Sequence, residues 1–181
     1  MSEESEVLKD VCRRLESAKI SYMITGSIAA NFYAVPRMTR DIDIVIEIFA
    51  KDIDRMPALF KSDFYIEGES VAEAIKEHGM FNILHNRYVI KIDFIILKII
   101  PYRTLEFQRR RPADFEGQKI WIVSPEDLIL SKLFWAKDSF SEMQIGDVKN
   151  LLRMVHNLDR VYIEKWIEPL GLSAIFQKVK Q

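Results

Sequence analysis

Hydrophobic and polar residues follow two different spacings along this chain. Apolar residues three or four positions apart predict helices over residues 4–19, 28–34, 51–60 and 71–78. Short, almost continuous apolar runs predict strands over residues 22–25, 42–48, 81–84, 88–97 and 119–123, with a hairpin around Asn86. Residues 102–110 fit either a helix or an extended segment. The order of these elements predicts a mixed α/β core.

A strong helix start follows the last predicted strand. Ser124 is a favourable N-cap, Pro125 occupies the first helical position and Asp127 lies three residues after the cap. From here to the C-terminus the pattern is helical, with breaks near Ser139, Asn157 and residues 169–171. We therefore expect an α/β core over residues 1–123 and a helical subdomain over residues 124–181 packed on it.

Composition and charge allow many functions and exclude a few. The chain has 181 residues, enough for one well-buried core, and a formal net charge of −1, so any contact with nucleic acid must be local. Its one cysteine, Cys12, lies on the apolar side of a predicted helix and fits a reducing compartment. The longest apolar stretch, residues 89–100, is interrupted by charges and too short to span a bilayer. The acidic first six residues lack a signal-peptide pattern. We expect a cytoplasmic protein without a membrane partner.

The candidate chemistry begins at a Gly-Ser turn. Gly26 and Ser27 lie between the first predicted strand and a helix that ends at Val35-Pro36. Backbone N–H groups at the start of a helix, together with a hydroxyl, can bind phosphate. Thirteen residues later, Asp41 and Asp43 stand at the beginning of the next apolar run.

Three aspartates stand in strand-like surroundings. Because side chains alternate along a strand that rises about 3.3 Å per residue, Asp41 and Asp43 share a face, with their carboxylates roughly 6–7 Å apart. Asp93 lies inside the apolar run of residues 89–97. At an effective dielectric near 20, two such charges repel by about 3 kcal/mol. A divalent cation would turn this repulsion into attraction, so the three acids predict a metal site.

Simpler explanations remain open for each of these features. An Asp-x-Asp pair at a strand edge is often solvated surface, and a Gly-Ser pair is a common turn. Asp93 could instead form a salt bridge with Lys91, its neighbour two residues away on the same face.

The combination of motifs resembles the polymerase-beta-type nucleotidyltransferase superfamily. The matching segments are Ile24-Thr25-Gly26-Ser27, Asp41-Ile42-Asp43-Ile44 and the later Asp93. Residues 37–43, the helix start of residues 125–133 and the segment 139–148 further resemble the small bacterial AbiEii-like toxins of type IV toxin–antitoxin systems. The resemblance covers residues 20–155 and departs from the toxins at Met143 and Gln144. It implies a nucleotidyltransferase-type mixed sheet flanked by helices and followed by helices.

The resemblance also implies a role for each matching residue. Gly26 and Ser27 would hold the phosphates of a nucleoside triphosphate (NTP). Asp41, Asp43 and Asp93 would be catalytic and would bind two Mg²⁺ or Mn²⁺ ions, and Asp93 would help to deprotonate an acceptor hydroxyl. Arg40 and Lys132 would contact the nucleotide, and the acidic Asp147 would face the cleft.

Alternatives exist for the remaining charged residues as well. Lys132 could be a lysine whose stem lies on a buried helix while its amine reaches solvent, and Asp147 could lie on a helix surface. Arg37 could contact phosphate beside Arg40. The basic residues 109–111 could bind an RNA backbone, although an exposed, charged helix end is the simpler interpretation.

These observations favour one function over two others. The leading hypothesis is a metal-dependent transfer of a nucleoside monophosphate from an NTP to a hydroxyl on tRNA, a protein or a small molecule, in a toxin–antitoxin setting with an antitoxin partner. The second is a non-catalytic nucleotide-binding or regulatory protein of the same fold. The third, a phosphohydrolase with Asp41 as nucleophile, ranks last because residues 44–46 continue the strand after the aspartates.

Overall fold

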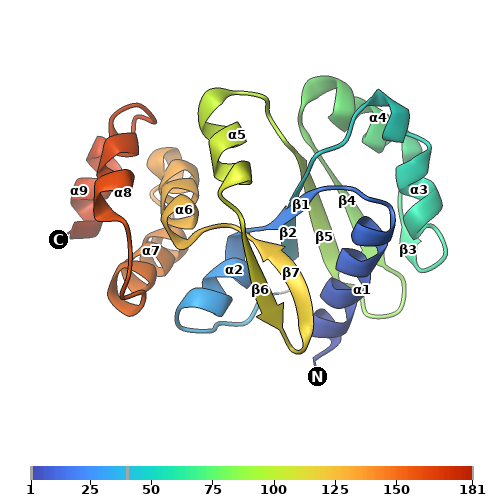
Figure 1. The fold of residues 1–181 in the computed structure, drawn as a ribbon, viewed down its shortest axis with the longest axis horizontal. Helices are drawn as coiled ribbons and strands as arrows, with labels where there is room; N and C mark the ends of the chain where they lie inside the picture. The colour runs from blue at the N-terminus through green and yellow to red at the C-terminus, as the bar shows by residue number, and fades with distance from the viewer. Residues whose placement is uncertain (1, 40, 181) are drawn as a thin grey trace.

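The computed structural model describes residues 2–39 and 41–180. Helices and strands are interspersed up to residue 122, and only helices follow (Figure 1). The helical elements are α1 (Glu3–Ser17), α2 (Gly26–Tyr33), the 3₁₀ turn η1 (Ala50–Asp52), α3 (Arg55–Phe60), α4 (Gly68–Glu77), α5 (Pro101–Gln108), α6 (Pro125–Ser139), α7 (Glu142–Met154), α8 (Arg160–Ile167) and α9 (Ser173–Lys180). The strands are β1 (Tyr22–Ile24), β2 (Asp41–Ile46), β3 (Phe64–Tyr65), β4 (Met80–His85), β5 (Lys91–Ile96), β6 (Arg111–Phe115) and β7 (Gln118–Ile122).

The strands form one mixed sheet in the order β3-β4-β5-β2-β1-β7-β6. The pairs β2–β5 and β1–β7 are parallel, and the pairs β1–β2, β3–β4, β4–β5 and β6–β7 are antiparallel. In the β2–β5 pair, Asp41 lies opposite Lys91 and Asp43 lies opposite Asp93. This register places the three aspartates at the middle of the sheet.

The two faces of the central strands differ in character. Ile42, Ile44 and Ile46 of β2 are fully buried and share a face with Ile92 and Phe94 of β5. The opposite face carries Asp43 and Asp93 together with the apolar Val45. The alternation in the sequence therefore separates a fully buried hydrophobic face from one that carries the aspartates.

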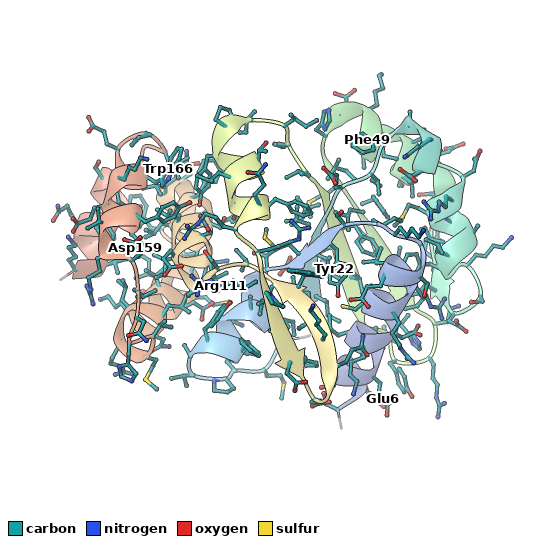
Figure 2. All side chains as sticks on the ribbon, in the orientation of Figure 1. Glu6, Tyr22, Phe49, Arg111, Asp159 and Trp166 are labelled. Carbon is teal, nitrogen blue, oxygen red and sulfur yellow. The ribbon has the colours of Figure 1, made fainter. Side chains whose placement is uncertain are left out.

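Helix α1 packs on the apolar face. The hydroxyl of Tyr22 on β1 donates a hydrogen bond of 2.8 Å to Glu16, and Figure 2 shows Tyr22 inside the molecule, beside this helix. Cys12 is buried there, and burial raises the pKa of its thiol to about 12. The predicted buried thiol is confirmed.

The C-terminal helices gather at one end of the sheet (Figure 1), where α6 packs against α7, α8 and α9 and also against α2. The predicted breaks near Ser139, Asn157 and residues 169–171 coincide with the ends of helices α6, α7 and α8. A division of the chain at residue 123 stays a prediction.

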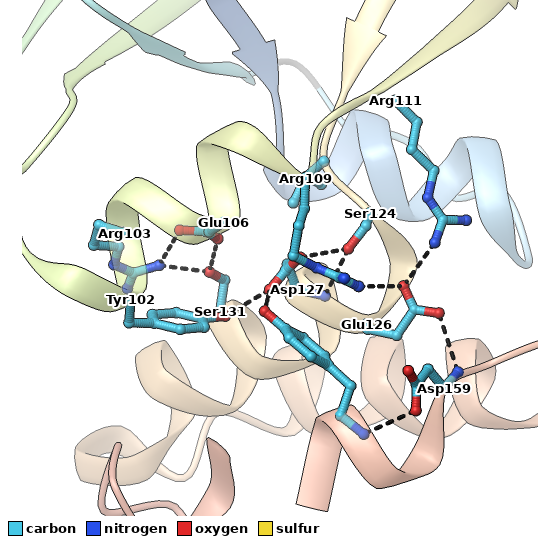
Figure 3. A network of polar contacts seen from close by, with 12 residues as sticks. Tyr102, Arg103, Glu106, Arg109, Arg111, Ser124, Glu126, Asp127, Ser131 and Asp159 are labelled. Carbon is cyan, nitrogen blue, oxygen red and sulfur yellow. Dashed lines mark hydrogen bonds and ion pairs between the residues drawn. The ribbon is translucent and has the colours of Figure 1, made fainter. Parts of the chain in front are cut away.

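A buried carboxylate, Asp127, joins these helices to the core (Figure 3). Its Oδ1 accepts hydrogen bonds from the hydroxyls of Tyr162 at 2.6 Å and Tyr102 at 3.3 Å. Its Oδ2 accepts from Ser124 at 2.6 Å and from Nε of Arg109 at 2.9 Å. Since a buried charge is stable only when it is paired and hydrogen-bonded, Asp127 fixes the start of α6 against α5 and α8.

The basic residues 109–111 belong to the same region. Arg111 contacts Glu126 at 3.1 Å, Arg109 contacts it at 3.6 Å, and the guanidinium of Arg110 lies over the ring of Phe107. The prediction of an exposed, charged segment holds for Arg111, whereas Arg109 and Arg110 are only partly exposed. Two of the three arginines neutralise acids at the start of α6.

One other prediction needs correction, one ambiguity is resolved and two strands are new. The helix predicted over residues 51–60 begins as the 3₁₀ turn η1, and α3 itself starts at Arg55. The ambiguous residues 102–110 form most of helix α5. Strands β3 and β6 were not predicted, because β3 has two residues and β6 contains Pro112 at the edge of the sheet, where the missing N–H is tolerated. None of the helices in the described residues is long and apolar enough to cross a membrane.

Candidate active site

Asp43 and Asp93 lie side by side at the centre of the sheet. They are register partners on the parallel strands β2 and β5, and neighbouring strands stand about 4.8 Å apart. Asp41 lies two residues before Asp43 and so points to the same face. The prediction that Asp41 and Asp43 share one face of a strand is confirmed, and the strand register places Asp93 on the same face.

Gly26 lies against the carboxylate of Asp43. A Cβ atom at position 26 would stand 1.9 Å from Oδ2 of Asp43, and the φ angle of Gly26 is +63°, in the left-handed region. The backbone N–H of Thr25 donates a hydrogen bond of 3.0 Å to the carbonyl of Asp43. The Gly-Ser turn is thus built to bring the start of α2 directly beside this aspartate.

Ser27 connects the turn to a chain of charged side chains. Its hydroxyl accepts a hydrogen bond of 2.7 Å from Nη2 of Arg37. The same guanidinium donates to both carboxylate oxygens of Asp147 on α7, at 3.1 and 3.0 Å. Lys132 on α6 donates to Asp147 at 2.8 Å and to Gln144 at 3.1 Å. Two cations therefore share one carboxylate beside the start of α2.

The electrostatics of this region reflect burial and close charges. Burial raises the pKa of Asp43, and the neighbouring charge of Asp93 raises it further. Burial lowers the pKa of the Lys132 amine, while its bond to Asp147 partly offsets this effect. Burial also acts to raise the pKa of Asp147, but hydrogen bonds from Arg37 and Lys132 outweigh it and leave that pKa lowered.

The simpler alternatives for Lys132 and Asp147 are wrong. Lys132 is 3% exposed and keeps its amine inside the protein, so it does not reach solvent. Asp147 is 7% exposed and lies between two cations, so it is not on a helix surface. Arg37, which donates to both Asp147 and Ser27, links the acid to the side chain of Ser27.

The alternative partner of Asp93 is present as well. Nζ of Lys91 lies 2.8 Å from Asp93 and 3.7 Å from Asp41, so one ammonium neutralises part of the acidic group. In the described part of the chain, no group of three or more His, Cys, Asp or Glu side chains is arranged so that it could hold a metal ion. The metal role of Asp41, Asp43 and Asp93 stays a prediction, and Arg40 lies outside the described residues.

Sequence reasoning missed two residues that position this site. Asn31 on α2 donates a hydrogen bond of 2.7 Å to the carbonyl of Arg37 and accepts one of 3.0 Å from its N–H. Gln144 accepts from Lys132 and stands where the resemblance expects an acidic residue. The departure from the toxin pattern at Gln144 could have drawn attention to this residue. A single asparagine in a helix, such as Asn31, has no pattern that marks it.

The sequence matches no protein-family model and no curated protein. Several solved structures have a similar fold, including the following three. ANT(2")-Ia in complex with adenylyl-2"-tobramycin is 11% identical, with a TM-score of 0.65 over 94% of this chain and 98% of that one. An antigenic nucleotidyltransferase-like protein from Paracoccidioides brasiliensis is 18% identical, with a TM-score of 0.60 over 99% of this chain and 93% of that one. The lincosamide antibiotic adenylyltransferase LnuA, lincomycin-bound, is 14% identical, with a TM-score of 0.57 over 86% of this chain and 99% of that one. The chain therefore has the mixed α/β fold of nucleotidyltransferases.

Proposed function

We propose that this protein is a metal-dependent nucleotidyltransferase that transfers a nucleoside monophosphate from an NTP to a hydroxyl group. The observation that carries the proposal is the register of β2 and β5, which sets Asp43 beside Asp93 while Gly26 lies against Asp43. Two adjacent acids with a helix start beside them supply ligands for a cation and N–H donors for a phosphate.

The triphosphate would bind on the side of α2. The N-terminal N–H groups of α2 and the hydroxyl of Ser27 can donate to phosphate oxygens. Arg37 and Lys132 place two cations next to this turn, and Asp147 holds both in position. The phosphate oxygens would take over part of the hydrogen bonding that Arg37 now gives to Ser27. The prediction that Gly26, Ser27 and Lys132 contact the nucleotide is part of this proposal.

A divalent cation would bind to the three aspartates only if Lys91 moved aside and their carboxylates turned toward one another. Asp41 and Asp93 already share one cation, the ammonium of Lys91. Asp43 is the register partner of Asp93, and burial, followed by the charge of Asp93, raises its pKa. Two Mg²⁺ or Mn²⁺ ions bound by Asp41, Asp43 and Asp93 would stabilise the charge on the attacking oxygen and on the leaving pyrophosphate.

The transfer itself is a displacement at phosphorus. The acceptor oxygen forms a bond to the α-phosphorus while the bond from that phosphorus to the pyrophosphate oxygen breaks. The hydroxyl proton of the acceptor goes to the carboxylate of Asp93, which lies at the end of the acidic group nearest to β4. Arg37 and Lys132 would orient the triphosphate throughout.

A labelled-nucleotide experiment tests the proposal. Each NTP, labelled at the α-phosphate, is incubated with the protein, Mg²⁺ and a cell extract, and the label is followed into acceptors. The proposal expects transfer by the wild type and none by Asp43→Asn. Equal transfer by a folded Asp43→Asn variant would overturn it.

A toxin–antitoxin role and an antitoxin partner are separate proposals. They are tested by measuring whether expression of the protein is toxic and whether a co-expressed partner relieves that toxicity.

One observation favours the alternative of a non-catalytic protein. Lys91 already neutralises Asp41 and Asp93, so the acidic group is tolerated without a metal. A regulatory or antitoxin protein of this fold would bind NTP without transferring it. Metal-dependent binding of NTP in a calorimetric titration, without any transfer of label in the experiment above, would establish this alternative.

A further inference from the structure

The same face of the sheet that carries the aspartates continues uncovered onto β4 and β3. Across the strands, Asp93 lies opposite Asn82, and Lys91 lies opposite Leu84, which in turn lies opposite Tyr65. Residues opposite one another in a sheet share a face, as do residues two apart on one strand. We call the four residues that continue this face the β3–β4 shelf: Tyr65, Met80, Asn82 and Leu84.

The side chains of the shelf are open to solvent. Tyr65 is 64% exposed, Met80 is 54% exposed and Leu84 is 36% exposed, and Asn82 is exposed as well. Their neighbours on β4, Phe81 and Ile83, are buried on the opposite face. Tyr65, Met80 and Leu84 thus offer exposed apolar side chains beside the acidic site, and the polar Asn82 lies between Met80 and Leu84 on β4.

Charge is distributed unequally on the two sides of the aspartates. On the side of β1 lie Ser27, Arg37 and Lys132, which suit a triphosphate. On the side of β4 the four shelf residues are uncharged. Lys91, the cation opposite Leu84 on β5, is already paired with Asp41 and Asp93. A polyanion would therefore meet two or three carboxylates here and gain no compensating cation.

From this asymmetry we propose that the β3–β4 shelf binds the acceptor, and that the acceptor is a small amphipathic alcohol without phosphate groups. This inference rests on the proposed function. The apolar side of the acceptor covers Leu84, Met80 and Tyr65, and the amide of Asn82 hydrogen-bonds a polar group. Its hydroxyl then reaches Asp93, the register partner of Asn82, and the triphosphate approaches from the opposite side. An RNA acceptor does not fit this surface.

Methyl NMR of protein labelled at Met and Leu methyl groups tests the site directly. The probes are a library of small amphipathic alcohols and, separately, single-stranded RNA oligonucleotides. We expect members of the alcohol library to shift the signals of Met80 and Leu84, and the oligonucleotides to leave them unchanged. Shifts of these signals by RNA, or no shift by any alcohol, would overturn the proposal.

A variant and a matched control separate local binding from general effects. Leu84→Lys places a charge on the shelf and should abolish the shift of Met80, because the apolar surface is interrupted. Val161→Lys adds the same charge on α8, where Val161 is 79% exposed, and should keep the shift. Retention of the Met80 shift in Leu84→Lys would contradict the inference. Neither measurement uses NTP, so a protein that binds alcohols on the shelf but no NTP would refute the proposed function while leaving the shelf site intact.

Discussion

The ammonium of Lys91 forms an ion pair of 2.8 Å with Asp93, which lies two residues further along the same strand. The same nitrogen lies 3.7 Å from Asp41 on β2. The bond to Asp93 raises the pKa of Lys91, since it favours the charged amine. In the absence of a metal, Lys91 is therefore the counter-ion of the acidic group, and any divalent cation must compete with it.

Lys91→Met should bind divalent cations more tightly than the wild type. A partly exposed ion pair contributes about 0.2–1 kcal/mol, so loss of the competing amine should tighten Mn²⁺ binding by about fivefold or less. Calorimetric titration with Mn²⁺ in the absence of nucleotide measures this effect. Lys76→Met is the control, because Lys76 pairs with Glu77 on the exposed side of α4. Weaker Mn²⁺ binding by Lys91→Met would mean that the lysine supports the site.

Gly26→Ala should destabilise the protein and abolish nucleotide binding. A left-handed conformation costs a residue other than glycine about 1–2 kcal/mol, and the new methyl group would also collide with the carboxylate of Asp43. Urea unfolding gives the stability, and calorimetric titration with Mg²⁺ and NTP gives the affinity.

Gly171→Ala separates the two causes. Gly171 has a similar φ of +66°, but nothing lies within 4 Å of an added Cβ. We expect this variant to lose about 1–2 kcal/mol of stability and to bind nucleotide as the wild type does. If Gly26→Ala were no worse than Gly171→Ala in either measurement, the close approach of Gly26 to Asp43 would have no functional importance.

Asp147→Asn should lose stability in a pH-dependent way. Asp147 has a lowered pKa, so the folded protein binds the proton of this carboxyl less tightly than the unfolded chain does. The ion pairs of Asp147 therefore stabilise the fold at pH values above 3.8, the ordinary pKa of an aspartate. Breaking a buried ion pair costs about 3–5 kcal/mol. We expect a loss of this order at pH 7 that shrinks as the pH falls below that value, because the wild-type carboxyl then becomes neutral too.

Urea unfolding at a series of pH values measures this difference. Asp54→Asn is the control, since Asp54 is exposed and its side chain makes no capping hydrogen bond. A difference between Asp147→Asn and the wild type that stays constant from neutral to acidic pH would contradict the ion-pair explanation.

The sequence predicts those parts of the site that depend on local spacing. Asp41 and Asp43 are two residues apart in a strand, so alternation alone puts them on one face. The start of α6 after the N-cap Ser124 follows from capping residues, whereas α2 begins at Gly26, two residues before its predicted start.

The sequence cannot predict contacts that depend on strand register and helix packing. No local pattern sets Asp43 beside Asp93 or joins Arg37 to Asp147, which lies 110 residues away. For the same reason, the sequence does not predict that Arg109 and Arg111 neutralise the acids at the start of α6. Family resemblance suggested that Asp147 faces the cleft, whereas composition alone favoured a helix surface.

The stability of Asp43→Asn tests the electrostatic account of the acidic group. Burial, followed by the charge of Asp93, raises the pKa of Asp43, so its charged form destabilises the fold as the pH rises above the ordinary value of 3.8. Removal of this charge should stabilise the metal-free protein at pH 7 by about 1–3 kcal/mol, as expected at an effective dielectric near 20. Urea unfolding in the presence of a chelator measures this difference, and a loss of stability would indicate a structural role for the carboxylate.

The most direct test of the central claim is calorimetric titration of the wild type and Asp43→Asn with the four NTPs, with and without Mg²⁺. We predict that the wild type binds at least one NTP only when Mg²⁺ is present, and that the folded variant binds none under the same conditions. Equal binding by Asp43→Asn, or no binding of any NTP by the wild type, would contradict a metal-dependent nucleotide site at Asp41, Asp43 and Asp93.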